Sequence, residues 1–149
     1  MAQDVVKLGD FQDWAAFSSG SGADKVCYVV SRPTRLQGGP DDRQAYVYIT
    51  HRPTRRAMGV VMVYAGYPYK ADSEVAVEIG QTTARLFTYR DTAWAADAAG
   101  DAALVRAMRA GRRMSVTASP AEGEPSTDIY SLSGVAAALN RIAEACPAR

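Results

Sequence analysis

The sequence predicts a mainly β domain, a β-sandwich of about eight short strands with two short helices near the C-terminal half. Three observations predict it. Short apolar runs with a period of two recur between turns rich in Gly, Pro, Asp and Ser. The densest apolar segment, residues 59–80, reads GVVMVYAGYPYKADSEVAVEIG. Two late stretches, one after residue 97 and one after residue 131, change to the spacing of a helix.

Residues 59–80 predict two strands separated by a corner. Residues 60–65 are apolar on both strand faces, so we expect cover on both sides, as in a sandwich interior or under a helix. The Tyr-Pro-Tyr sequence at 67–69 interrupts the pattern because proline cannot donate a ladder hydrogen bond. Residues 75–79 resume with one polar face. A buried helix is the rival interpretation of 60–65, and the β-branched content favours a strand.

The N-terminal third predicts three strands. Residues 11–17, FQDWAAF, alternate as a first strand. The second is expected at 26–31, ended by Pro33, and the third at 45–51, ended by Pro53. The stretch between them, LQGGPDDR, predicts a loop with no strand of its own. One domain is expected to cover residues 1–149, with about residues 1–10 as a flexible extension.

The C-terminal half mixes strands with helices. Asp101 is the expected N-cap of the first helix and Gly111 its C-cap. The second helix is expected to start at Ser131 or Ser133, with Val135 on its apolar face, and to stop before the proline at 147. The remaining strands are expected at residues 84–89, 93–96, 114–118 and 128–132.

Composition narrows the class of protein. A chain of 149 residues with 48% apolar and 22% charged residues is typical of one soluble globular domain. A net charge of +1 argues against charge steering toward nucleic acid. The apolar runs are too short for a transmembrane helix. The first residues, MAQD, contain neither a basic nor an apolar signal region, so we expect that an intact signal peptide is absent from this sequence.

Catalytic and metal-binding patterns stay at background level. His51 is the single histidine, and a structural or surface role is favoured over that of a general base. No Gly-x-Ser-x-Gly elbow and no P-loop are present. One histidine and two distant cysteines do not match a structural zinc site. We therefore expect a protein that is not an enzyme, with no catalytic residue, no metal and no cofactor.

The chain contains two cysteines, Cys27 and Cys146. Two buried free thiols are one interpretation, because unpaired cysteine behaves as a small hydrophobe. One disulfide is the other, and it would tie an early strand to the C-terminal helix. The residues alone leave both alternatives open.

Arginines gather at two strand ends. Arg-Pro-Thr-Arg occurs at residues 32–35 and again at 52–55, within a stretch of residues 32–56 with a local charge of +4. Residues 72–101 have a local charge of −4. Solvated strand ends are the favoured interpretation, and a basic rim that binds an anionic partner is the alternative hypothesis. The candidate anion- or partner-binding residues are Arg32, Arg35, Arg52, Arg55 and Arg56.

Tyrosines are concentrated in the predicted strands. Packing and strand propensity are the favoured explanation, and an aromatic platform for carbohydrate is the alternative. Seven of the eight tyrosines form this group: Tyr28, Tyr46, Tyr48, Tyr64, Tyr67, Tyr69 and Tyr89.

Several stretches together resemble a known family. They are FQDW at residues 11–14, VCYVVSRP at 26–33, AYVYITHRP at 45–53, AGYPYKADSEVAVEIG at 65–80, AWAAD at 93–97 and DIYSLSG at 128–134. In order and spacing the chain resembles the invasion-associated locus B family of bacterial exported proteins. The resemblance implies an immunoglobulin-like β-sandwich, exported after removal of a signal peptide, with Cys27 and Cys146 joined in a disulfide. One departure is Phe17, where many relatives carry a further cysteine.

From this resemblance we expect a non-enzymatic exported protein, periplasmic, secreted or associated with the outer envelope. The family's invasion-associated members are implicated in host-cell interaction, so the resemblance also implies a virulence-associated role. The alternative is a small-ligand, glycan or anion-binding module that uses an Arg/Tyr surface. A protein, a glycan or an envelope component is the expected partner, with no nucleic acid and no transmembrane segment.

Overall fold

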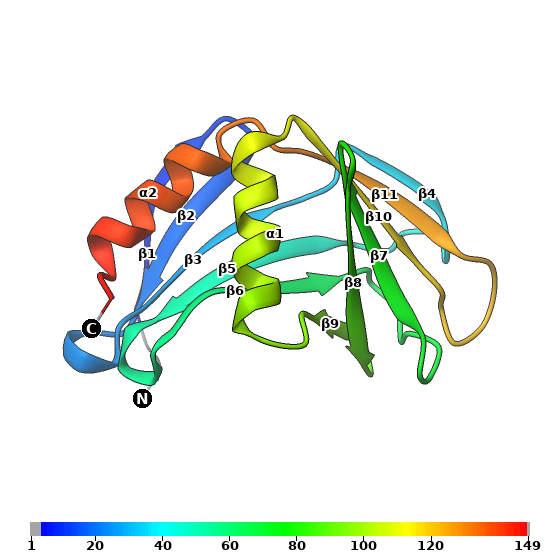
Figure 1. Cartoon of the computed structure of the whole chain (residues 1–149), viewed down its shortest axis with the longest axis horizontal. Helices are drawn as coiled ribbons and strands as arrows, with labels where there is room; N and C mark the ends of the chain where they lie inside the picture. The colour runs from blue at the N-terminus through cyan, green and yellow to red at the C-terminus, as the bar shows by residue number, and fades with distance from the viewer. Residues whose placement is uncertain (1–3, 149) are drawn as a thin grey trace.

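The computed structural model describes residues 4–148. The protein folds as one continuous sheet of eleven strands, in the order β1-β2-β3-β5-β6-β9-β8-β7-β10-β11-β4, in which every neighbouring pair is antiparallel. The sheet arches, and the helices α1 and α2 lie against its left and central part in Figure 1. The strands are β1 (Val5–Phe11), β2 (Trp14–Ser19), β3 (Val26–Ser31), β4 (Arg35–Gly38), β5 (Tyr46–Arg52), β6 (Ala57–Tyr64), β7 (Glu74–Ile79), β8 (Thr82–Tyr89), β9 (Thr92–Trp94), β10 (Arg113–Ala118) and β11 (Ser126–Ser131). The helices are α1 (Ala98–Ala110) and α2 (Val135–Ala145), and the short 3-10 turns are η1 (Gly22–Asp24) and η2 (Pro53–Arg55).

The mainly β class with two helices is confirmed, whereas the sandwich of about eight strands is not. The strands join one sheet instead of two facing ones. The number of strands exceeds the expectation because the stretch expected as one strand at 11–17 contains the turn of a hairpin. β1 and β2 meet at this tight turn, in which Gln12 adopts a left-handed φ of 56°. β4 adds a further strand inside the stretch expected to be a loop, where it pairs with β11 along the sheet edge. The start expected to be flexible holds β1, apart from residues 1–3, which lie outside the described residues.

One face of the sheet forms the hydrophobic core with both helices. On β5 and β6 the residues Val47, Ile49 and Val61 are completely buried. Leu104 and Met108 of α1 and Leu139 and Ile142 of α2 belong to the same buried cluster. Strand alternation explains the arrangement, because every second side chain of a strand points to the same face. We call this side the covered face.

The helices are placed by specific contacts. Asp97, not Asp101, caps α1, since its carboxylate accepts the backbone N–H of Gly100 at 2.8 Å. Asp101 instead turns inward, where its Oδ1 accepts the backbone N–H of Val61 at 3.0 Å and fastens α1 to β6. Before α2, Gly134 adopts a φ of +91° directly against the carbonyl of Phe11, where a Cβ would overlap that carbonyl. This position therefore requires glycine.

Candidate binding site on the open face of the sheet

The second face of the central strands has no helix packed against it. Val60, Met62 and Tyr64 of β6 alternate with the buried residues of that strand and remain half-buried. The expectation that residues 60–65 would be covered on both faces is therefore wrong for one of them. We call this second side, over β2, β3, β5, β6, β9 and β8, the open face.

Cross-strand register aligns apolar residues over the open face. In one row Val30 pairs with Tyr48, Tyr48 with Met62, Met62 with Trp94, and Trp94 with Phe87. Directly opposite residues in an antiparallel sheet are close enough for their side chains to touch. The row ends at Phe87, which is 48% exposed. The five strands β3, β5, β6, β9 and β8, which do not follow one another in this order along the chain, thus build one apolar surface.

The aromatic rings of the open face pack against one another. Phe17 and Tyr28 stack with ring centroids 5.3 Å apart, and Tyr28 lies 5.9 Å from Tyr48. Tyr46 continues the ladder at 6.1 Å from Tyr48 and 6.3 Å from Tyr64. These separations fall within the range of favourable aromatic pairs. The rings therefore occupy much of each other's surface and hold the face in a fixed shape.

Two shallow grooves lie on the open face and share Tyr28 and Tyr48. The first has a volume of about 530 Å³, and Arg32 lines it together with the turn residues Gln12 and Asp13. The second, of about 550 Å³, has Arg52 and Arg55 in its lining. Its remaining lining residues are Ser19, Val26, Tyr28, Tyr48, Thr50, Ala57, Val60, Met62 and Trp94.

The structure does not bring the five candidate arginines into one rim. Because β3 and β5 are antiparallel, with Ser31 opposite Val47 and Cys27 opposite His51, the two Arg-Pro-Thr-Arg stretches lie at opposite ends of this strand pair. Arg32 lies 5.3 Å from the ring of Tyr46 and lines the first groove.

Arg35 lies on the edge strand β4 and lines neither groove, although its neighbour Thr34 lines the first. Arg52 and Arg55 come together because Pro53 starts the 3-10 turn η2, which reverses the chain. Arg56 completes the reversal with a left-handed φ of 54° and lines neither groove. Sequence reasoning thus identified the two arginines of the second groove, but grouped them with others that lie elsewhere.

Arg43, which the sequence reasoning did not single out, is buried. Its side chain and that of Asp128 are each 2% exposed, and Nη2 of Arg43 lies 2.5 Å from Oδ1 of Asp128. Nη1 also donates to the carbonyl of Ala65 at 2.9 Å. The hydrogen bond with Asp128 raises the pKa of Arg43. A signal was available, since Ser126, Asp128 and Tyr130 alternate on the inward side of a strand, where a carboxylate needs a cation.

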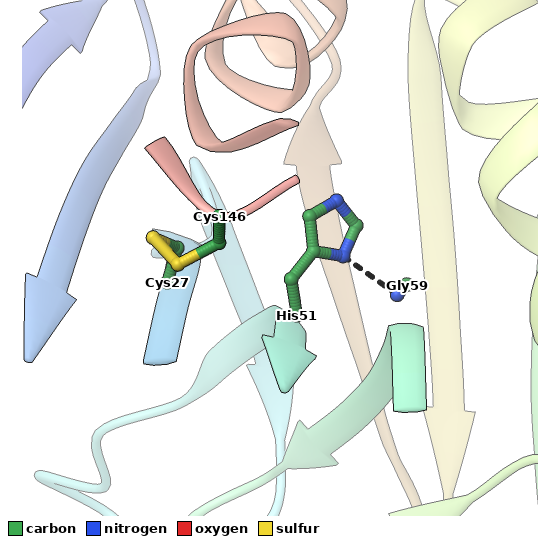
Figure 2. Close-up of a disulfide and its surroundings, with 4 residues drawn as sticks. All are labelled: Cys27, His51, Gly59 and Cys146. Atoms are coloured by element: carbon green, nitrogen blue, oxygen red, sulfur yellow. Dashed lines mark hydrogen bonds between the residues drawn. A yellow bond between two sulfur atoms is a disulfide. The ribbon is translucent and has the colours of Figure 1, made fainter. Parts of the chain in front are cut away.

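His51 lies on the covered face beside the disulfide that joins Cys27 of β3 to Cys146 after α2. The two cysteine Cα atoms are 6.0 Å apart. Figure 2 shows His51 next to this disulfide, with Nδ1 accepting the backbone N–H of Gly59 at 2.8 Å. Burial lowers the pKa of His51, and the positive charge of Arg109 acts in the same direction. The imidazole is thus a neutral acceptor that holds the start of β6.

Within residues 4–148 the structure contains no group of three or more His, Cys, Asp or Glu side chains that could hold a metal ion. In the same residues no helix is long and apolar enough to span a membrane.

Comparison with known families identifies the chain's relatives. The family model described as "Invasion associated locus B (IalB) protein" matches residues 14–143. The chain belongs to the IalB family. The matched region includes every strand of the open face, from β2 to β9 and β8.

A solved structure resembles this IalB protein. The crystal structure of invasion associated protein B from Bartonella henselae matches it with a TM-score of 0.63 and 18% sequence identity, over 94% of this chain and 97% of that chain. At this identity the likeness shows a common fold. No curated protein sequence matches the chain.

The IalB match ends before Cys146, so the covalent link between β3 and α2 rests on this chain's own structure. The open face and its two grooves likewise come from this chain's own side chains.

Proposed function

We propose that this IalB protein is a non-enzymatic exported protein, periplasmic, secreted or on the outer envelope, that binds a partner through the open face of its sheet. The observation that carries the proposal is an apolar face whose side chains are only partly buried. Stacked aromatic rings hold this face in shape, and arginines flank it. Apolar surface left uncovered beside polar residues is a common mark of a binding site.

Two observations support export. Disulfides form and persist in oxidising compartments, and this chain joins its two cysteines across a sequence separation of 119 residues. The IalB family description associates its members with invasion, a process at the cell surface. Both fit the periplasm, the outer envelope or the medium.

The environment of His51 supports a role without catalysis. Its Nδ1 already accepts the Gly59 N–H, and in the neutral ring, which the lowered pKa favours, the other nitrogen carries the proton, so no acceptor nitrogen is left for a general base. The ring lies on the covered face beside the disulfide, away from the grooves. A hydrolytic activity that disappears in His51→Ala while the variant stays folded would contradict this part of the proposal.

Cell fractionation with thiol labelling tests the compartment. Cells that produce the full native gene product are separated into cytoplasmic, periplasmic, outer-membrane and secreted fractions, and free thiols are alkylated before mass spectrometry. We expect the protein outside the cytoplasm with Cys27 and Cys146 unlabelled. A cytoplasmic protein with both thiols labelled would overturn the export proposal.

The name of the Bartonella relative suggests the biological setting, contact with a host cell, which we extend to this chain as part of the proposal. A strain that lacks the protein should associate less with host cells. Wild-type protein and Arg35→Gln, a change away from both grooves, should restore association, whereas Met62→Glu on the open face should not. Equal restoration by all three would remove the open face from the role.

Among small ligands, the second groove favours an anion over a glycan. Its lining contains Arg52 and Arg55 but no Asp, Glu, Asn or Gln to hydrogen-bond sugar hydroxyls. The faces of Phe17 and Tyr28 are stacked on each other, so that pair does not offer both faces to a sugar ring.

A further inference from the structure

The second groove combines an apolar floor with positive charge at one end. Tyr28, Thr50 and Val60 lie opposite one another across β3, β5 and β6, and the neighbouring row is Tyr48, Met62 and Trp94. Thr50 is the one residue of these two rows without an aromatic ring or a mainly apolar side chain. A ligand that lies on this floor must itself be apolar along most of its length.

Arg52 and Arg55 stand where β5 ends and η2 begins. Tyr48 is four residues back along the same strand, about 13 Å at the usual rise of a strand. The charged end and the apolar floor are therefore separated along the groove. This arrangement fits a long molecule with one charged end, and it does not fit a compact ion or a uniformly charged polymer.

The two arginines have no carboxylate partner within the described residues. Salt bridges in residues 4–148 involve Lys7 with Asp10 and Arg43 with Asp128, and neither includes Arg52 or Arg55. Asp24 shares a smaller hollow with both arginines but forms no ion pair with them, and Lys25 in the same hollow offsets its charge. A guanidinium group binds a carboxylate through parallel N–H donors, so the pair is free to hold an acidic head group.

We propose that the second groove binds a free fatty acid of medium chain length, such as laurate, with its carboxylate on Arg52 and Arg55 and its acyl chain along the floor that Val60, Met62 and Trp94 form. Met62 suits such a ligand, because its flexible thioether side chain adapts to an acyl chain. The groove volume of about 550 Å³ lies within the usual range for small-molecule sites. This inference rests on the proposed function and names the partner of the same face.

Binding of laurate to the purified protein, measured by isothermal titration calorimetry below the micelle concentration, tests the proposal. Dodecanol has the same chain with an uncharged head, and we expect it to bind about ten- to a hundredfold more weakly, because hydrogen bonds between charged partners are lost. Absence of laurate binding, or equal affinity for dodecanol, would overturn the proposal.

Two double variants separate the groove from general positive charge. Arg52→Gln/Arg55→Gln should lose about tenfold or more in laurate affinity while its affinity for dodecanol stays unchanged. The matched control Arg35→Gln/Arg56→Gln removes the same charge outside both grooves and should bind laurate as the wild type does. Equal losses in both double variants would mean that laurate responds to net charge, and would overturn the assignment.

Met62→Glu tests the floor, because its carboxylate would repel the ligand and interrupt the apolar row. It should abolish laurate binding, with folding verified by circular dichroism and thermal unfolding. Other occupants of the groove give different results. A dimer in sedimentation that Met62→Glu dissociates would show that a second copy of the chain covers the groove. Binding to anionic vesicles without binding to free laurate would show that the groove meets a membrane surface, and either result would overturn the fatty-acid proposal. Neither outcome bears on export or on the oxidation of the cysteines, so the proposed compartment is tested separately.

Discussion

The two faces of strands β5 and β6 are made of similar apolar residues but differ in how deeply these residues are buried. On the covered face Ile49, Val61 and Val63 are at most 2% exposed and pack under α1 and α2. On the open face Tyr48, Val60 and Met62 are half-buried and line a groove. Apolar character alone therefore does not predict burial. The helices cover one face, and the other retains apolar surface that costs solubility unless it serves a partner.

Removal of the disulfide, which links α2 to the sheet, should have the largest effect on the free energy of unfolding. Cys27→Ala/Cys146→Ala should lower the free energy of unfolding by about 4–5 kcal/mol, since the bridge closes a very long loop in the unfolded chain. Urea unfolding of the wild type and the variant under non-reducing conditions measures this. A loss below about 1 kcal/mol would mean that packing alone holds α2 on the sheet.

The buried ion pair tests the polar part of the core. Arg43→Met should cost about 3–5 kcal/mol, because it leaves the carboxylate of Asp128 buried without a partner. The double variant Arg43→Met/Asp128→Leu should recover most of this loss, since neither buried charge remains. Urea unfolding of the wild type, the single variants Arg43→Met and Asp128→Leu, and the double variant gives the coupling free energy between the two side chains. If the single and double variants are equally unstable, the packing of Arg43 matters more than its charge.

A matched pair of truncations compares the two faces directly. Ile49→Ala should cost about 3 kcal/mol because it leaves a cavity in a fully buried site. Met62→Ala should cost roughly 1 kcal/mol, because its side chain already contacts water. Thermal unfolding of both variants checks the difference. Equal losses would show that the open face is covered in solution, as a self-associated protein would be.

His51 should give the smallest effect, visible as a pH dependence. Its pKa is lowered by burial in the folded state, so the unfolded chain binds more protons as pH falls below about 6.5. Stability contributed by the neutral ring is thus present above the unfolded pKa and declines as pH falls toward the folded pKa. His51→Asn keeps an acceptor for Gly59 and does not titrate.

The difference in unfolding free energy between wild type and His51→Asn, followed from pH 5 to 7.5, isolates this contribution. The subtraction removes other titrating groups such as Asp101, whose pKa burial raises and which therefore acts in the opposite direction. We expect the wild type to lose more stability than the variant toward acid pH. Parallel curves would place the imidazole in solvent.

Strands with clear local signals could be predicted from the sequence. β3, β5 and β7 stand as β-branched or alternating runs next to proline or turn residues, and each was expected close to its observed range. The turn between β1 and β2 was missed because Gln12 takes a left-handed conformation without glycine, and the alternation runs on through it. β4 was missed because it is short, exposed and contains Gly38.

The candidate site was predicted only in part because its parts meet through strand pairing. Arg52 and Arg55 stood out as a local motif, but nothing local shows that Trp94 of β9 pairs with Met62 of β6. The two Arg-Pro-Thr-Arg copies have the same sequence but lie apart in the fold. Because β3 and β5 pair antiparallel, Arg32 lies at the opposite end of this strand pair from Arg52. Similarly, the choice between Asp97 and Asp101 as cap depended on the position of Val61 relative to α1.

The position of the disulfide has a consequence for the making of the protein. Cys27 belongs to β3 and Cys146 follows α2, so the two can meet only after the 119 residues that separate them in sequence have been synthesised. A copy that stops between residues 27 and 146 carries a single cysteine and cannot form the internal bridge. In an oxidising compartment such truncated copies would carry a lone thiol that thiol-exchange enzymes can attack, and the bond between Cys27 and Cys146 thereby reports that synthesis has passed residue 146.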